Sequence, residues 1–356
     1  MMRRWLTIFA LTLGFTVLGW AQAQPPLVIQ WLSFALDNNN QPVPIRLNPT
    51  TGLPDLTNGV PVDSRFPSIS ADGRQVIFQV GSGQLAELWQ ANWDATNNLW
   101  QVNFVPVPQS APPQTLLGIK PVISADGNHI AFASWKDYTS QPPFPDLPKA
   151  QIYVLDRAQN RIVPVSFFWI DTDNDGLRDA YRPSNGNCVP VHISSDGRIV
   201  VFLALSPDAL NIVDEDGDGN PDSVSNPPEG WLVLIHDRDA DGNGVYDETE
   251  VGSTRTFVGS YDWDTSTNQP IVVSTASVTV SSNGRIIAFT APMPFDPNNP
   301  NDPNRERWTV VVRDWQTQMP NPQSPAEIGI IQRIDDAFAA TLSDDGTYVA
   351  FLEPVK

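Results

Sequence analysis

A short segment recurs five times along the 356 residues, and it constrains the fold more than any other feature. Each copy has an apolar-alternating run, then Ser-x-Asp-Gly or Ser-x-Asn-Gly, then a second apolar run that ends in Phe. Asp-Gly or Asn-Gly between alternating apolar runs is a strong β-hairpin signal, because both residues tolerate the backbone of a tight turn. The sequence therefore predicts five hairpins, PSISADGRQVIF (67–78), PVISADGNHIAF (121–132), VHISSDGRIVVF (191–202), VTVSSNGRIIAF (278–289) and ATLSDDGTYVAF (340–351).

The repeated aspartate is interpreted as a turn residue and not as a catalytic one. Asn283 replaces it in the fourth copy. Asn and Asp share turn geometry but not acid–base chemistry, so the turn is the property that all five copies have in common.

A second pair of strands follows the hairpin in the second, third and fourth copies. The segments are AQIYVLDRAQNRIVPVSF (150–167), GWLVLIHDRD with STRTFVGS (230–239 and 253–260), and RWTVVVRDWQ with AEIGIIQRI (307–316 and 326–334). Four antiparallel strands repeated at spacings of 54, 70, 87 and 62 residues between the turn glycines are typical of propeller blades. The predicted fold is all-β, a five-bladed β-propeller of four-stranded antiparallel blades.

The two ends of the chain are predicted to close the ring together. The fifth copy has a hairpin but no second strand pair before Lys356. LVIQWLSFALDNNNQPVPIRL (27–47) is interpreted as the missing pair, so the N-terminal strands would pair with the C-terminal hairpin. Residues 24–356 would then form one propeller domain.

The repeats resemble those of TolB-like propellers, which are similar to WD-repeat propellers and whose repeat reads roughly Pro-x-φ-Ser-Pro-Asp-Gly, with φ apolar. The resemblance covers nearly the whole mature chain and implies the fold more than the function. The proline of Ser-Pro-Asp-Gly is replaced here by Ala71, Ala125, Ser195, Ser282 and Asp344. The α/β domain of TolB has no counterpart, so a role in the Tol system does not follow.

The first 23 residues are predicted to be a secretory signal peptide. Arg3 and Arg4 precede an apolar run from Trp5 to Trp20, and Ala21-Gln22-Ala23 is a small-x-small cleavage site. An uncleaved membrane anchor is the alternative. We therefore expect an exported protein, periplasmic or extracellular, with no membrane insertion after cleavage.

Charge and cysteine content limit the partners and the means of stabilisation. The net charge of −19 argues against nucleic acid, because phosphate binding requires Lys/Arg patches. The single cysteine, Cys188, excludes an internal disulfide and is predicted to be buried or inert. We expect a monomer that is stabilised by its core and by metal.

Three aspartate-rich stretches carry the pattern of calcium loops. Alternate carboxylates can surround one ion, and glycine at position 6 allows the sharp turn. Loop three, DRDADGNGVYDE (237–248), matches the EF-hand template, while loops one and two resemble the shorter loops of dockerins and thrombospondin type 3 repeats. The predicted Ca²⁺ ligands are Asp171, Asp173, Asp175 and Asp179 in loop one (DTDNDGLRD), Asp214, Asp216, Asp218 and Asp222 in loop two (DEDGDGNPD), and Asp237, Asp239, Asp241, Asn243 and Glu248 in loop three.

In the predicted blades, loops one and two share a face, and loop three lies on the opposite one. Calcium would then clamp one blade at both ends, as a structural ion and not a catalytic one. A solvated acidic surface is the alternative.

The function expected first is non-enzymatic recognition of a protein or glycan partner. It would use the long loops that join the second and third strands and those that join successive blades. A carbohydrate-active enzyme is the alternative, with carboxylates at the channel mouth, for which Asp63, Asp335 and Asp336 are the candidates; ordinary surface ion pairing would also explain them. A purely structural envelope protein is the third possibility.

Overall fold

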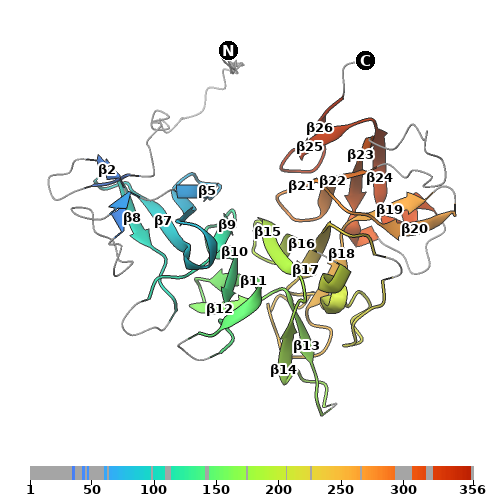
Figure 1. Ribbon diagram of the computed structural model, residues 1–356, viewed down its shortest axis with the longest axis horizontal. Coiled ribbons are helices and arrows are strands. Elements are labelled where there is room, and N and C mark those ends of the chain that lie inside the picture. The colour runs from blue at the N-terminus through green and yellow to red at the C-terminus, as the bar shows by residue number, and fades with distance from the viewer. Residues whose placement is uncertain are drawn as a thin grey trace. The chain divides into compact units, whose positions relative to one another are not determined.

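The computed structural model describes strand residues 34–36, 42–44, 46–47 and 60–61, and residues 64–353 with gaps at 98, 109–113, 141–143, 174, 206, 225–226, 265–266, 293–306 and 318–323. The predicted signal peptide lies outside the described residues. The described elements are β-strands and four short 3-10 turns (Figure 1). The turns are η1 (Gly83–Leu85), η2 (Pro207–Ile212), η3 (Trp315–Thr317) and η4 (Pro325–Ile328).

Four antiparallel sheets of four strands follow one another along the chain, and within each the strand order is sequential. The first has β5 (Ser64–Ile69), β6 (Gln75–Val80), β7 (Glu87–Asp94) and β8 (Leu99–Phe104), and the second has β9 (Ile119–Ile123), β10 (His129–Lys136), β11 (Asp146–Asp156) and β12 (Arg161–Pro164). The third has β15 (Asn187–Ile193), β16 (Ile199–Leu205), β17 (Trp231–Asp237) and β18 (Arg255–Val258), and the fourth has β21 (Ser277–Val280), β22 (Ile286–Pro292), β23 (Trp308–Asp314) and β24 (Ile330–Asp335). The prediction of all-β, four-stranded antiparallel repeats is confirmed.

The five repeated turns share one hydrogen-bonding pattern, which explains the repeated serine and aspartate. In each, the serine hydroxyl donates to the side-chain oxygen two residues later, at 2.5–2.7 Å. The same serine oxygen accepts the amide of the residue that opens the next strand, as Ile286 N to Ser281 Oγ at 2.9 Å shows. Asn283 substitutes for aspartate in this pattern without loss, so the prediction of a turn role is confirmed.

Successive turns are joined to one another across the repeats. The amide of Ala71 donates to the carbonyl of Ala125 at 3.0 Å. Ser195 N donates to Ser282 O at 2.8 Å, and Ser282 N donates to Asp344 O at 2.7 Å. These bonds fix the first hairpin to the second, the third to the fourth, and the fourth to the fifth.

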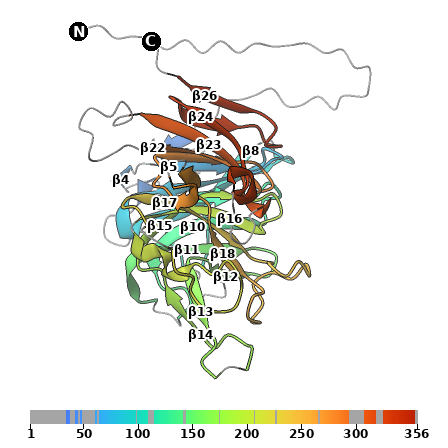
Figure 2. The ribbon, with the colours of Figure 1, turned by 90° about the vertical axis from the view of Figure 1, so that its right-hand side faces the viewer.

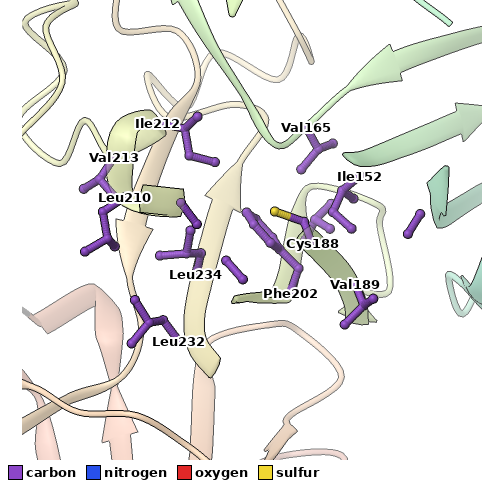
Figure 3. Packing of buried hydrophobic residues seen from close by; sticks show 14 of the residues in the cluster. Ile152, Val165, Cys188, Val189, Phe202, Leu210, Ile212, Val213, Leu232 and Leu234 are labelled. Atoms are coloured by element: carbon purple, nitrogen blue, oxygen red, sulfur yellow. The ribbon is translucent and has the colours of Figure 1, made fainter. Parts of the chain in front are cut away.

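The apolar cores lie between consecutive sheets. Because β-strands alternate their side chains, both faces of a central strand can be buried when a sheet is covered on each side. Phe132 and Tyr153 belong to the core shared with the first repeat, while Ile152 packs in the core shared with the third. Figure 3 shows the latter core around Phe202 and the buried Cys188.

The fifth hairpin is β25 (Phe338–Leu342) and β26 (Val349–Leu352), which form a two-stranded sheet. Among the described strands, β1 (Phe34–Leu36) pairs with β2 (Pro42–Pro44) and β3 (Arg46–Leu47) with β4 (Val60–Pro61). Pairing between these N-terminal strands and β25–β26 is not formed within the described residues. Ring closure and the number of blades stay predictions.

Two further hairpins were not expected from the sequence. They are β13 (Phe167–Ile170) with β14 (Ala180–Pro183), and β19 (Tyr261–Asp264) with β20 (Gln269–Val272). The first carries loop one at its tip, and Figures 1 and 2 show this hairpin at the bottom of the view, below β12 and β18. It therefore positions one of the predicted metal loops.

Candidate metal centre

Loop one is a turn in which the carboxylates converge. The amide of Gly176 donates to Asp171 Oδ2 at 2.9 Å, and the amide of Thr172 donates to Asp179 Oδ2 at 2.9 Å. Carboxylate oxygens of Asp171, Asp173 and Asp179 lie within 4.8 Å of one another. Asp175 instead accepts the amide of Leu177 at 2.8 Å and lies outside this cluster.

Loop two repeats the arrangement. Gly219 N donates to Asp214 Oδ2 at 3.3 Å, and the amide of Glu215 donates to Asp222 at 2.5 Å. Asp214, Asp216 and Asp218 offer oxygens within 4.8 Å of one another, whereas Asp222 lies outside the cluster. The two loops thus assemble three of their four predicted carboxylates each.

The electrostatics of loop two oppose a fully ionised cluster without a counter-ion. Burial raises the pKa of Asp214 above its usual value, and repulsion from Asp222 and Asp216 raises it further. Asp214 itself is 7% exposed. A bound cation would stabilise its ionised form, because a nearby opposite charge favours ionisation.

In loop three the same hydrogen bonds occur two residues later than the match to the EF-hand template predicts. Gly244 N donates to Asp239 at 3.2–3.3 Å, as Gly176 does to Asp171 and Gly219 to Asp214. The amide of Asn243 donates to Asp241, and the amide of Val245 donates to Asn243, again as in the other loops. The equivalent of the first ligand is therefore Asp239, and not Asp237.

Asp237 has another role. Its carboxylate accepts two hydrogen bonds from Arg198, at 2.7 and 2.8 Å. Arg198 also lies 3.7 Å from Asp239. Within the described residues, loop three does not bring three carboxylates together, and Glu248 instead accepts a hydrogen bond from the side chain of Asn243 at 2.7 Å.

The expected placement of loop three opposite loop one is wrong. Leu177 of loop one forms an antiparallel bridge with Glu250, and the amide of Arg178 donates to Thr249 O at 2.8 Å. The guanidinium of Arg178 also reaches the carbonyl of Glu248, the last residue of loop three, at 3.3 Å. The reason is the β13–β14 hairpin, which carries loop one away from its repeat and against the segment after loop three.

Loops one and two share one small cavity, as their predicted common face requires. It has a volume of about 20 Å³ and is lined by Asp171, Asp214 and Gly219, together with Arg178 and His236. A cavity of this volume can hold about one water molecule. The two carboxylate clusters thus flank a common space.

The donor set fits a hard divalent cation better than a transition metal. Calcium takes six to eight oxygen ligands at about 2.3–2.6 Å, so oxygens separated by up to about 5 Å can share one ion. Both clusters offer carboxylates alone, without histidine or cysteine. Backbone carbonyls and water would complete the coordination.

The carboxylates predicted for an enzyme site are engaged in ion pairs. Arg333 Nε lies 3.2 Å from Asp335 Oδ1, and Asp336 pairs with Arg307. Surface ion pairing, the alternative for these residues, accounts for both. Asp63 lies outside the described residues.

The three histidines and the cysteine all lie in strands. His129 and His236 lie in strands and are buried, at 8% and 2% exposed. His192 is half-buried, and its Nε2 has no hydrogen-bond partner among the described residues. Cys188 is buried, which raises the pKa of its thiol to about 12, so the prediction of an inert cysteine is supported.

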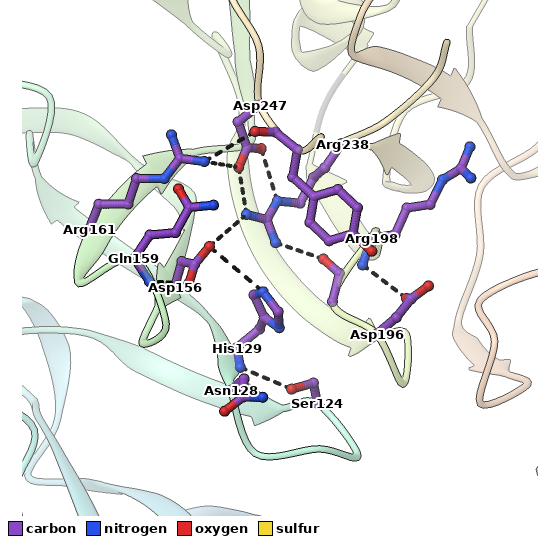
Figure 4. A network of polar contacts seen from close by, with 12 residues as sticks. Ser124, Asn128, His129, Asp156, Gln159, Arg161, Asp196, Arg198, Arg238 and Asp247 are labelled. Atoms are coloured by element: carbon purple, nitrogen blue, oxygen red, sulfur yellow. Dashed lines mark hydrogen bonds and ion pairs between the residues drawn. The ribbon is translucent and has the colours of Figure 1, made fainter. Parts of the chain in front are cut away.

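Sequence reasoning missed the polar network around loop three. Asp247 accepts Arg238 Nε at 2.9 Å and lies 3.2 Å from Arg161 Nη2 (Figure 4). A signal was present, since the three loops share Asp-x-Asp-x-Asp/Asn-Gly-x-x-Asp, with the last aspartate at Asp179, Asp222 and Asp247. Aligning on that aspartate would have placed the start of loop three at Asp239.

No protein-family model and no curated protein sequence matches this chain. Among solved structures, TolB from Acinetobacter baumannii is 14% identical over 86% of this chain and 56% of that one, with a TM-score of 0.39. The putative TolB from Agrobacterium tumefaciens is 13% identical over 87% and 99%, with a TM-score of 0.30. The β-propeller domain of the trilobed protease from Pyrococcus furiosus is 10% identical over 87% and 71%, with a TM-score of 0.37.

The chain spans about half the length of the Acinetobacter TolB structure that it matches. Since all three TM-scores are below 0.5, the fold rests here on the sheets described above. Within the described residues, none of the helices is both long and apolar enough to cross a membrane.

Proposed function

We propose that this chain is an exported TolB-like β-propeller stabilised by calcium at loops one and two, which acts as a non-enzymatic recognition scaffold. The observation that carries the calcium proposal is the convergence of three carboxylates in each of the two loops. The ions would be structural, because in each loop the three carboxylates come from one turn, which the ion would hold together. Loop three is proposed as a further, weaker site that uses Asp239 and Asp241, because Arg198 already neutralises Asp237.

The test is thermal unfolding of the mature chain in calcium and in EGTA. A ligand at about one hundred times its Kd stabilises by about 2.7 kcal/mol, which corresponds to a rise in Tm of several degrees for a domain of this size. The double variants Asp171→Asn/Asp173→Asn and Asp214→Asn/Asp216→Asn should each lose part of that rise. Asp94→Asn is the matched control, since Asp94 caps the exposed β7–β8 turn with no acidic neighbours in its hydrogen bonds.

An equal melting temperature in calcium and EGTA would contradict the calcium proposal. The acidic loops would then be solvated surface. Loss of the calcium response in Asp94→Asn as well would point to a general effect of charge and not to the two sites.

The five-bladed closure is also part of the proposal. β25–β26 lacks two of the four strands that the other repeats have, and it exposes Tyr348 (73%) and Leu352 (56%). Pairing with residues 27–47 would cover this apolar surface and complete a four-stranded sheet like those of the other repeats. Deleting residues 24–47 from the mature chain should then lower Tm by more than 5 °C, whereas an unchanged Tm would argue against closure.

The recognition role is proposed for the loops between β10 and β11, β16 and β17, and β22 and β23, for a protein or glycan partner and a monomeric scaffold. Long loops on a rigid β-framework are where binding sites most often occur. The engagement of Asp335 and Asp336 in ion pairs favours recognition over hydrolysis. Affinity capture from an envelope extract in calcium, compared with a variant in which residues 294–305 become Gly/Ser, should lose its partner if that loop binds it.

A further inference from the structure

A cavity of about 400 Å³ lies away from the two carboxylate clusters, between the β11–β12 turn and loop three. Its wall includes His129 and Asp156 from the second repeat, and Val245 and Tyr246 from loop three. Figure 4 shows the polar groups around it. This volume falls in the range of small-molecule sites, about 300–1,000 Å³.

The carboxylate of Asp156 has unused hydrogen-bonding capacity. It is 2% exposed, and among the described residues it accepts one hydrogen bond, from the amide of Gln159 at 2.9 Å. The basic groups nearest to it are beyond hydrogen-bond length, with His129 Nε2 at 3.8 Å and Arg238 Nη2 at 3.9 Å. An ionised carboxylate can accept about four hydrogen bonds, so burial with one is costly unless a ligand or water supplies more.

The two arginines nearby are directed elsewhere. Arg238 is fully buried and donates to both oxygens of Asp247, and its Nη1 donates to Gly197 O at 2.7 Å. Arg161 donates to the Tyr246 carbonyl at 3.1 Å and to Asp247 at 3.2 Å. Asp247 therefore takes the hydrogen bonds that would otherwise satisfy Asp156.

A second polar group beside the cavity is also unsatisfied. His129 Nδ1 is buried and has no hydrogen-bond partner among the described residues, with Asp126 at 3.9 Å. The His129 side chain is 10% exposed, and its ring centroid lies 6.2 Å from that of Tyr246. Buried polar groups are usually paired, so two such groups at one cavity favour a polar ligand.

The charge around the cavity is negative. In the ion-pair network that includes Asp156, three carboxylates outnumber two guanidinium groups with His129 neutral, namely Asp126, Asp156 and Asp247 against Arg161 and Arg238. The rest of the wall comes from Ala158, Val245 and Tyr246, together with Gln159 and Gly244. A cationic head on an aliphatic stem complements both features, with the head against the carboxylate of Asp156 and the stem against Val245 and Tyr246.

We propose that this cavity binds a primary ammonium group carried on an aliphatic stem, with Asp156 as its counter-ion and Tyr246 against its stem. The source is a free alkylamine or the lysine side chain of a partner. The inference rests on the proposed recognition role but on neither calcium cluster. Because Val245 and Tyr246 belong to loop three, the titration is made both in calcium and in EGTA, which separates failure of the calcium proposal from failure of this one.

The experiment is a titration of the ¹⁵N-labelled mature chain, followed by amide chemical shifts, with Nα-acetyl-lysine amide and with cadaverine. Both should shift the amides of Gly244 and Tyr246 with Kd values of about 0.1–10 mM, as expected for a few hydrogen bonds and little buried area. Nα,Nε-diacetyl-lysine amide, which has no charge on its stem, should not bind. Tighter binding of cadaverine would identify a free amine, and tighter binding of the lysine derivative would identify a protein side chain.

Two test variants and one control variant make the result specific. Asp156→Asn should weaken binding about tenfold or more, because a hydrogen bond between two charges is replaced. Asp314→Asn is the matched control, since Asp314 ends β23 as Asp156 ends β11 but is paired with Arg285. Val245→Arg, at a position 52% exposed, tolerates the long side chain and should abolish binding by placing a tethered cation at the rim.

The proposal is overturned if the diacetyl compound binds as well as the amine. It is also overturned if Asp156→Asn or Val245→Arg keeps the wild-type Kd while its spectrum shows a folded chain. A loss in Asp314→Asn equal to that in Asp156→Asn would likewise count against a local site.

Discussion

Arg178 of loop one donates from Nη1 to the hydroxyl of Thr254 at 2.8 Å and from Nη2 to its carbonyl at 3.0 Å. Thr254 belongs to the segment that connects loop three to β18. Burial lowers the pKa of Arg178 to about 10, which leaves the guanidinium charged at neutral pH. One side chain thus fastens the hairpin tip that carries loop one to the third repeat.

Replacing Arg178 with leucine should therefore destabilise the chain by about 2 kcal/mol, because charge-assisted hydrogen bonds to partly buried groups are lost. Urea unfolding in EGTA measures this. Arg182→Leu is the control, since Arg182 makes one long hydrogen bond, from Nη2 to Asn211 O at 3.4 Å, and lies over the Phe168 ring as Arg178 lies over Trp169. An equal loss of unfolding free energy in both variants would show that the hydrogen bonds of Arg178 with Thr254 do not contribute to stability.

Asp237→Asn should lower stability by about 1–3 kcal/mol, equally in calcium and in EGTA. The reason is that Asp237 is 5% exposed and forms a two-point ion pair with Arg198, so the change leaves the guanidinium without its partner. A calcium ligand would behave differently, with a loss confined to the calcium-bound state. Comparing the denaturant midpoints of Asp237→Asn and Asp171→Asn in both buffers separates the two roles, and a purely calcium-dependent loss at Asp237 would restore the earlier register of loop three.

The repeats could be predicted from the sequence because their information is local. Ser194, Asp196 and Gly197 satisfy one another within four residues, and the alternating strands on each side need a covering sheet on both faces. The third and fourth strands of the sheets could also be predicted, since they too are short apolar runs.

The register of loop three is ambiguous in the sequence, because the EF-hand template fits from Asp237 while the last aspartate shared by the three loops favours Asp239. Arg198, which lies 39 residues before Asp237, decides between them by pairing with it. The β13–β14 hairpin was missed for a similar reason. Its strands have only four residues each. Its position depends on contacts between distant residues, such as Arg178 with Thr254, which no local sequence pattern predicts.

Substitution of the turn glycines should distinguish turn geometry from packing between repeats. Gly73 and Gly284 hold the same position, with φ of 68° and 76°, so alanine at either costs about 1–2 kcal/mol from the backbone alone. A Cβ at Gly73 meets nothing within 4 Å, whereas a Cβ at Gly284 would lie 2.7 Å from the buried side chain of Ile199. Gly284→Ala should thus cost at least about 1 kcal/mol more than Gly73→Ala by urea unfolding, and equal costs would contradict the close packing of neighbouring turns.

His236 should make the protein less stable as the pH falls from about 6.5 to 4. Burial lowers its pKa to about 4, and the effect of burial exceeds the opposing attraction of Asp247 and Asp237. Its folded pKa is below the unfolded value of about 6.5, so the unfolded chain binds more protons between these values. The stability from His236 is therefore complete above about pH 6.5 and declines by up to about 3 kcal/mol toward pH 4.

The measurement is the free energy of unfolding in urea at several pH values between 7 and 4.5, in EGTA so that calcium release does not contribute. His236→Asn should flatten the slope, because no proton can be taken up at that position on unfolding. Thr256→Val is the matched control, since it removes the hydroxyl 2.9 Å from His236 Nδ1 but leaves the imidazole buried. It should lower stability at every pH and keep the slope, whereas a wild-type slope in His236→Asn would assign the acid sensitivity to other groups, such as His129 or His192, whose pKa values burial also lowers.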